Sequence, residues 1–274
     1  MTLLRWGRAE RAYRRGYRYL RGASVPHDPI AALHWLNRAA RYGHAGAQHT
    51  LSMIYLSGAS GRASCASWVA EAHSAGSPAA ASNADLLYPG GLDVKPDTAL
   101  AFAWAKAAAR RGLACAEANL GMLLTRGIGC RTDFEEAAAW YRRAADKGEA
   151  AGALGLGILH EGGLGVTKNV AEAMRWYRKA AESGNDVAAT ALGLLLASGS
   201  ADEPNPAEAQ RWLNGPAARG FAHAQYGLGL LALQANDESR ARFWLSKAQA
   251  QGHTGARTAL AKLQPSDNAG DAAA

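Results

Sequence analysis

The sequence is poor in features that would point to several other classes of protein. Cysteine occurs only as Cys65, Cys115 and Cys130, unevenly spaced and without a CxxC pair, which argues against a disulfide framework and a structural zinc site. We therefore expect buried, reduced thiols. Long apolar runs are also missing, so the sequence predicts no signal-peptide core and no transmembrane segment. The expected compartment is the cytoplasm.

Aromatic residues are scarce as well, at 8% of 274 residues, although 49% of the chain is hydrophobic. The small residues alanine and glycine are abundant instead. A core built from small residues lets helices approach one another closely, which favours helix packed on helix.

The net charge of +7 belongs to one end of the chain. Residues 1–43 hold nine arginines against two acidic residues, Glu10 and Asp28, whereas the remainder has 21 basic and 21 acidic residues. A basic stripe along the whole molecule would favour nucleic acid. A patch confined to one end argues against nucleic acid as the main partner and predicts a local anionic contact.

Seven of the eight tryptophans form a ladder with a period close to 36 residues, and a glycine stands eight residues after each of them. A period of this length is typical of a solenoid of repeated helix pairs. The tryptophans are Trp35, Trp68, Trp104, Trp140, Trp176, Trp212 and Trp244, and the glycines are Gly43, Gly76, Gly112, Gly148, Gly184, Gly220 and Gly252.

The residues around each tryptophan predict one helix. An Asp or Asn seven residues before the tryptophan can accept hydrogen bonds from the first helical turn. Small residues such as Ala137 and Ala144 share a helix face with Trp140, so we expect the tryptophans between helices. The glycine suits a left-handed C-cap. The predicted N-caps are Asp28, Asp97, Asp133, Asn169, Asn205 and Asp237, with Glu136, Glu172 and Glu208 completing capping boxes.

A second helix follows each glycine. Its buried stripe is a small residue, a leucine four later and an aliphatic residue three after that, as in Ala116, Leu120 and Leu123. A glycine directly after the leucine costs about 1 kcal/mol relative to alanine in mid-helix, and close helix crossing would compensate. These glycines are Gly121, Gly157, Gly193 and Gly229.

The resulting pattern, AxxxLGxLxxxGxGVxxDxxxAxxWYxxAAxxG, is clearest in residues 113–184. It resembles the Sel-one-like repeat (SLR), a relative of the tetratricopeptide repeat (TPR), over roughly residues 9–264. The resemblance implies an all-α, right-handed α-solenoid superhelix of about seven helix-turn-helix repeats with a concave groove. It also implies a bacterial protein that serves as scaffold or adaptor.

The predicted organisation is one solenoid over residues 1–264, followed by a disordered tail over 265–274 that has nothing apolar to bury. Pro216 inside the Trp212 helix predicts a kink or an early stop. Repeat 2 is short and has Ala84 and Asp85 in place of leucine and glycine. The expected repeats span about 8–43, 44–76, 77–112, 113–148, 149–184, 185–220 and 221–252, with a capping helix over 253–264.

No residue pattern predicts catalysis, and we expect no cofactor and no metal. Gly155 and Gly157 resemble part of a dinucleotide loop, but the repeat itself explains them. The histidines show no ligand spacing, and His44 and His253, next to helix-ending glycines, are expected to cap helices or meet solvent. The sequence therefore indicates a protein that is not an enzyme.

Candidate partner-binding residues follow if the second helices line the concave side, as in the tetratricopeptide relatives. The positions of these helices that would face the groove are mostly polar in the first repeats, and apolar in later repeats, as at Leu154 and Ile158. In the related family, asparagines and basic residues at such positions clasp a peptide. The candidates are Tyr13, Arg14, Tyr17, Arg21, His49, Thr50, Asn83, Asn119 and Arg126.

The leading hypothesis is a monomeric adaptor that holds a partner protein or peptide in its groove, with an acidic or C-terminal stretch of the partner near the arginine-rich end. One alternative is binding of nucleic acid or an anionic membrane through the arginine-rich first helix. A second is a purely structural subunit of a larger assembly.

Overall fold

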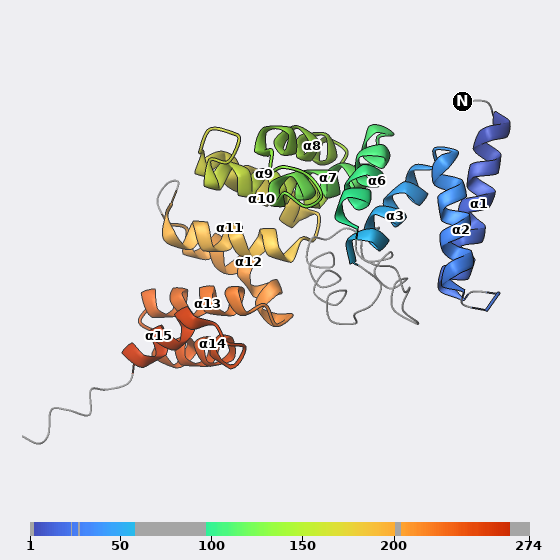
Figure 1. The fold of residues 1–274 in the computed structure, drawn as a ribbon. Coiled ribbons are helices and arrows are strands. Elements are labelled where there is room, and N and C mark those ends of the chain that lie inside the picture. The colour runs from blue at the N-terminus through green and yellow to red at the C-terminus, as the bar shows by residue number, and fades with distance from the viewer. Residues whose placement is uncertain (1–2, 23, 27, 58–96, 201–203, 264–274) are drawn as a thin grey trace, which may run out of the picture. The chain divides into compact units, whose positions relative to one another are not determined.

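The computed structural model describes residues 3–22, 24–26, 28–57, 97–200 and 204–263, and these residues form thirteen α-helices and no strand (Figure 1). They divide into two compact units, Met1–Asn185 and Asp186–Ala274. The first unit contains α1 (Leu3–Arg21), α2 (Pro29–Arg41), α3 (Ala45–Ser57), α6 (Thr98–Arg110), α7 (Ala114–Arg126), α8 (Phe134–Asp146), α9 (Ala150–Gly162) and α10 (Val170–Glu182). The second contains α11 (Asp186–Ser198), α12 (Pro206–Ala218), α13 (Ala222–Gln234), α14 (Glu238–Ala250) and α15 (Thr254–Lys262).

Two kinds of helix alternate along each unit, which confirms an all-α solenoid of helix-turn-helix repeats. We call the tryptophan-bearing helices A helices, namely α2, α6, α8, α10, α12 and α14. The helices α1, α3, α7, α9, α11, α13 and α15 are B helices. Each A helix packs most extensively against the B helix that precedes it among the described helices.

All six predicted N-caps are confirmed. Each Asp or Asn side chain accepts a hydrogen bond from the backbone N–H three residues later, at 2.8–3.1 Å. The capping boxes are wrong, because the backbone N–H of the cap is already used. Asp133 N–H donates to the carbonyl of Leu124 in the preceding B helix at 3.1 Å. Glu136 accepts instead from the Trp140 indole at 3.1 Å.

The mid-helix glycines of the B helices are positions of close approach, as predicted. A Cβ added to Gly157 would lie 2.4 Å from the ring of Tyr177, the residue after Trp176. The residue after Trp176 therefore fills a hole over a B-helix glycine. The same relation holds for Gly16 with Leu36, Gly121 with Tyr141, Gly193 with Leu213 and Gly229 with Leu245.

The tryptophans themselves are not the core. The six described members of the ladder are half-buried, whereas Leu36, Ala105, Tyr141, Tyr177, Leu213 and Leu245, which directly follow them, are buried. Basic side chains cover the outer indole faces, as when Arg143 lies 4.5 Å from the Trp140 ring centroid. The prediction that the ladder fills the space between helices is therefore wrong by one residue.

Among the described helices α3 packs against α6, whereas the sequence predicted a Trp68 helix and a further B helix between them. These predicted helices, with Gly76, Ala84 and Asp85, lie outside the described residues. The Asp97 N–H at the start of α6 donates to the Tyr55 carbonyl of α3 at 3.0 Å. This bond is equivalent to the one from the Asp133 N–H to the Leu124 carbonyl. Ser52 stands where most of the other B helices have glycine, and the small residue Ala105 follows Trp104. This repeat therefore departs from the pattern of a glycine facing a large side chain.

Three smaller predictions have mixed outcomes. The early stop at Pro216 is wrong, because α12 ends at Ala218 with the same length as the other A helices and Pro216 removes only a bond of its last turn. Cys115 and Cys130 are free thiols but half-buried rather than buried. Cys65 and the tail over 265–274 lie outside the described residues.

Candidate functional site

The first helix, α1, carries an aromatic surface beside its buried stripe. Tyr13 and Tyr17 are half-buried with ring centroids 5.7 Å apart, and the Arg21 guanidinium lies 5.1 Å from the Tyr17 centroid. Trp6 lies on the same side, about two turns before Tyr13 and about three turns before Tyr17, and is 59% exposed. We call Trp6, Tyr13 and Tyr17 with Arg14 and Arg21 the aromatic face of α1.

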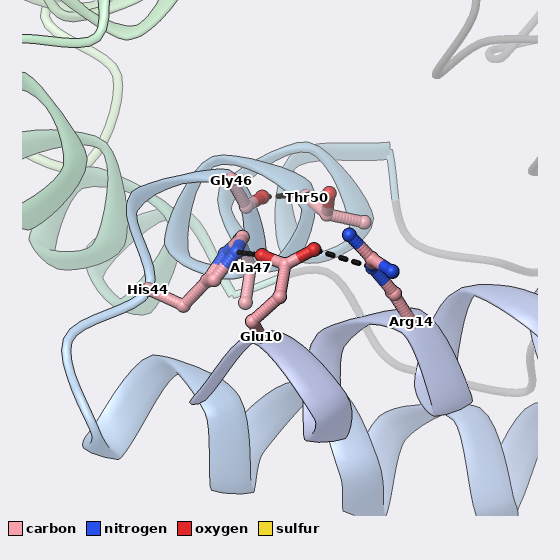
Figure 2. Close-up of polar contacts among 6 residues, drawn as sticks. All are labelled: Glu10, Arg14, His44, Gly46, Ala47 and Thr50. Carbon is pink, nitrogen blue, oxygen red and sulfur yellow. Dashed lines mark hydrogen bonds and ion pairs between the residues drawn. The ribbon is translucent and has the colours of Figure 1, made fainter. Parts of the chain in front are cut away.

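A polar cluster holds the aromatic face against α3 (Figure 2). His44 Nδ1 accepts from the Ala47 N–H at 3.1 Å, so its proton is on Nε2, which donates to Glu10 Oε2 at 2.9 Å. Glu10 Oε1 accepts from Arg14 Nε at 2.6 Å. His44 also stacks on Tyr13 with centroids 4.2 Å apart. The cluster joins the first turn of α3 to α1 and orients Arg14.

This arrangement suits binding rather than proton transfer. The hydrogen bonds from His44 and then Arg14 lower the pKa of Glu10, which remains a carboxylate. Both ring nitrogens of His44 are occupied, so it has no lone pair for a substrate or a metal. The Arg14 side chain is 75% exposed and keeps N–H donors facing solvent. Burial raises the pKa of Tyr13, whose hydroxyl stays neutral.

The predicted capping role of histidine is confirmed at both of its positions. His253 Nδ1 accepts from the Ala256 N–H at 3.2 Å at the start of α15, and Tyr226 stacks on its ring at 4.4 Å. His44 and Tyr13 repeat this arrangement at the start of α3. Burial is the main cause that lowers the pKa of His253, with nearby His223 acting in the same direction.

Three predicted binding residues are too buried to form an exposed site. His49, Thr50 and Asn119 are only 4%, 3% and 8% exposed. Thr50 Oγ1 donates to the Gly46 carbonyl at 2.8 Å, and Asn119 Nδ2 donates to Ser52 Oγ at 3.4 Å between α7 and α3. The Asn119–Ser52 hydrogen bond joins α7 to α3. These three side chains therefore belong to the packed interior and not to an exposed binding surface.

The remaining candidates divide as follows. Tyr13, Arg14, Tyr17 and Arg21 lie together on α1, whereas Arg126 is exposed in the last turn of α7. Asn83 lies outside the described residues. Sequence reasoning missed Trp6 and Glu10, although Trp6 stands seven residues before Tyr13 and Glu10 four residues before Arg14, spacings that share a helix face.

His49 predicts acid sensitivity of the fold. Neither of its ring nitrogens has a hydrogen-bond partner, and burial lowers its pKa to about 4. A histidine buried in its neutral form opposes protonation, so stability is present above the unfolded pKa near 6.5 and falls as the pH drops toward 4. We expect a loss of about 3 kcal/mol over this interval.

The test is chemical denaturation at pH 7 and pH 4 of the wild type, His49→Leu and the exposed-histidine control His34→Asn. His49→Leu should lose about 3 kcal/mol less on acidification than the other two proteins. Equal losses in all three would show that His49 is not the cause.

Comparison with known proteins decides the family. A family model described as Sel1 repeat matches residues 12–44, 80–113, 116–149, 150–185, 186–214 and 222–253, which is more than half of the chain. The chain belongs to the Sel1 repeat family. Sel1 repeat proteins generally mediate protein–protein interaction and are generally non-enzymatic scaffolds.

One solved structure of a Sel1 repeat protein shares the fold, and a second is similar in sequence. A Sel1 repeat protein from Oxalobacter formigenes is 26% identical, with 89% of this chain and 88% of that chain covered and a TM-score of 0.67. The protective antigen c5321 of uropathogenic Escherichia coli, described as having an SLR fold, is also 26% identical, over 94% of this chain and 64% of that chain, with a TM-score of 0.45. A search of the curated proteins found no match.

The matched Sel1 repeats follow the B-then-A order of the structure. Residues 116–149 contain most of α7 and all of α8, and residues 150–185 contain α9 and α10. No match covers residues 45–79, which include α3. The B helix that packs against α6 thus lies outside the matched Sel1 repeats, as does α15.

None of the helices in the described residues is long and apolar enough to cross a membrane. The described part of the chain also shows no cluster of three or more His, Cys, Asp or Glu side chains suited to a metal ion.

Proposed function

We propose that this Sel1 repeat protein is a non-catalytic adaptor that binds an acidic segment of a partner protein on the aromatic face of α1. The observation that carries the proposal is the composition of this face. Trp, Tyr and Arg are the residue types that contribute most to protein–protein binding energy, and here Trp6, Tyr13, Tyr17, Arg14 and Arg21 lie on one helix side.

The electrostatics of the face support an acidic partner. Arg14 and Arg21 are exposed, and among the described residues the carboxylate paired with Arg14 is Glu10, which His44 also shares. A carboxylate from a partner could therefore meet free guanidinium donors, while the tyrosine rings and Trp6 provide apolar contact. We place this activity in the bacterial cytoplasm and assign it to a monomer. The free thiols of Cys115 and Cys130 are compatible with a reducing compartment.

The experiment starts from an unbiased probe. A displayed library of random twelve-residue peptides is selected against the full chain, and association and dissociation rates of the enriched peptides are then measured. We expect acidic peptides. R14Q/R21Q should slow association by about tenfold at low salt, because long-range attraction governs encounter. Tyr17→Ala should mainly speed dissociation, because its contacts form only after binding.

A charge-matched control separates local from global charge effects. R110Q/R111Q removes two exposed arginines at the end of α6 and should leave both rates within about twofold of the wild type. Asn119→Ala should change stability rather than dissociation, because Asn119 is buried. Enriched peptides without acidic residues, or equal effects of both arginine pairs, would overturn the proposal.

A further inference from the structure

A second surface of α1 consists of arginine alone. Arg8, Arg11, Arg15 and Arg18 are exposed and follow one another at helical spacing, on the side away from the buried residues Ala9, Ala12, Gly16 and Leu20. We call these four residues the arginine face. At about 100° per residue, Arg11 and Tyr13 lie about 160° apart around the helix, whereas Arg18 lies only about 40° from Arg14. The arginine face therefore points away from the tyrosines but adjoins the arginine edge of the aromatic face.

The arginine face lacks counter-ions. The acidic residues described among the first 57 are Glu10, which binds Arg14 and His44, and Asp28, which caps α2. No carboxylate of the described residues forms an ion pair with the arginine face. Like charges three or four residues apart destabilise a helix by a few tenths of a kcal/mol per pair. An uncompensated local penalty of this kind points to a functional requirement.

Some cations elsewhere in the described chain are paired with carboxylates. Buried Glu117 accepts from Arg143 at 3.0 Å and from Lys147 at 2.8 Å. In the second unit, Arg219 forms a bidentate contact with Asp186. The arginine face differs from these two sites because its four arginines lie on one helix and no carboxylate of the described residues is paired with them.

An indole orders part of the arginine face and extends it onto α2. The guanidinium carbons of Arg15 and Arg38 lie 4.3 and 5.3 Å from the ring centroid of Trp35. A guanidinium over an aromatic ring keeps its in-plane N–H donors available for an anion. Two cations held at one ring without a carboxylate are prepared for a ligand with more than one negative charge.

The composition of the face selects among polyanions. A protein interface needs an apolar anchor, and a membrane surface needs apolar side chains to insert. The large exposed apolar side chains of the described residues are Trp6, Ile158, Leu164 and Phe243, and none belongs to the arginine face. A phosphate backbone needs only regularly spaced guanidinium donors.

We propose that the arginine face, together with Arg38, binds the phosphate backbone of nucleic acid without sequence preference. This activity would be additional to partner binding on the aromatic face. It would make the protein a link between a bound protein segment and a nucleic acid.

The test measures fluorescence anisotropy of a labelled twenty-nucleotide oligothymidylate titrated with the full chain at several salt concentrations. With four to five phosphate contacts, the logarithm of affinity should fall with the logarithm of salt with a slope of about −3. R11Q/R15Q/R18Q should weaken binding at least tenfold and reduce the slope by about 2. R11K/R15K/R18K keeps the positive charges but loses the forked donor geometry of the guanidinium, so its affinity should lie between those of the wild type and R11Q/R15Q/R18Q.

Matched controls make each outcome decisive. R110Q/R111Q/R131Q removes three exposed arginines elsewhere in the first unit, and Tyr17→Ala alters only the aromatic face, so both should bind oligothymidylate within about threefold of wild type. Circular dichroism verifies that each variant is folded. No binding at 50 mM salt, equal loss in the control triple, or equally tight arginine-dependent binding of polyglutamate or phosphatidylserine vesicles would overturn the proposal.

Discussion

Replacing Tyr177 by alanine should lower the free energy of unfolding by about 4 kcal/mol, in the range for a large buried side chain. Tyr177 is 1% exposed and its ring fills the hole over Gly157. Its hydroxyl donates to Glu161 Oε2 at 2.5 Å, and burial, followed by this bond, raises the pKa of Tyr177. The substitution would leave both a cavity and an unpaired carboxylate.

The neighbouring substitution Trp176→Ala is the matched comparison. Trp176 is half-buried and lies between Arg142 and Lys179, 5.0 and 5.2 Å from its ring centroid. We expect a loss of about 2 kcal/mol, because much of its surface meets solvent or long side chains. Urea denaturation followed by circular dichroism would compare the two. A larger loss of unfolding free energy for Trp176→Ala than for Tyr177→Ala would show that the ladder tryptophans, and not the residues after them, form the core.

Gly129→Ala should be nearly as damaging, with a loss of about 4 kcal/mol. Gly129 lies in the loop between α7 and α8 with φ +71°, and an added Cβ would lie 2.0 Å from the Thr98 carbonyl oxygen of α6. The left-handed conformation contributes about 1–2 kcal/mol of strain for alanine, and overpacking about 1–3 kcal/mol more. The loop therefore rests on the start of the previous A helix and sets the repeat spacing.

Gly148→Ala isolates the first of these two causes. Gly148 has φ +84° and nothing within 4 Å of an added Cβ, so its substitution should cost only about 1–2 kcal/mol. Thermal and urea denaturation of both variants would measure the difference. Equal losses would mean that the contact between Gly129 and Thr98 can relax without cost.

The features predicted correctly from the sequence are those that depend on nearby residues. An Asp or Asn cap such as Asp133 bonds to an amide three residues away, so its role is visible in the chain itself. The capping boxes failed because the cap amide donates to a carbonyl of the preceding helix, which a local pattern does not contain. The tryptophan ladder likewise shows the period but not whether the tryptophan or the residue after it lies deeper.

The pairing of α3 with α6 illustrates a second limit. Every B helix offers the same carbonyl to the next cap, so the bond from Asp97 to Tyr55 resembles that from Asp133 to Leu124. Periodicity identifies such helices without choosing which ones meet. The sequence likewise does not show that Thr50 and Asn119 are buried, which leaves Tyr13, Arg14, Tyr17 and Arg21 as the accessible candidates on α1.

Photo-crosslinking of a selected acidic peptide tests most directly whether the aromatic face of α1 is the partner-binding surface. A peptide from the displayed library, carrying a photoreactive residue beside its acidic stretch, is irradiated with the full chain, and the modified residues are located by mass spectrometry. We predict modification within α1 around Trp6, Tyr13 and Tyr17, lost in R14Q/R21Q and retained in R110Q/R111Q. Modification mainly in α9 around Leu154 and Ile158, unaffected by R14Q/R21Q, would contradict it.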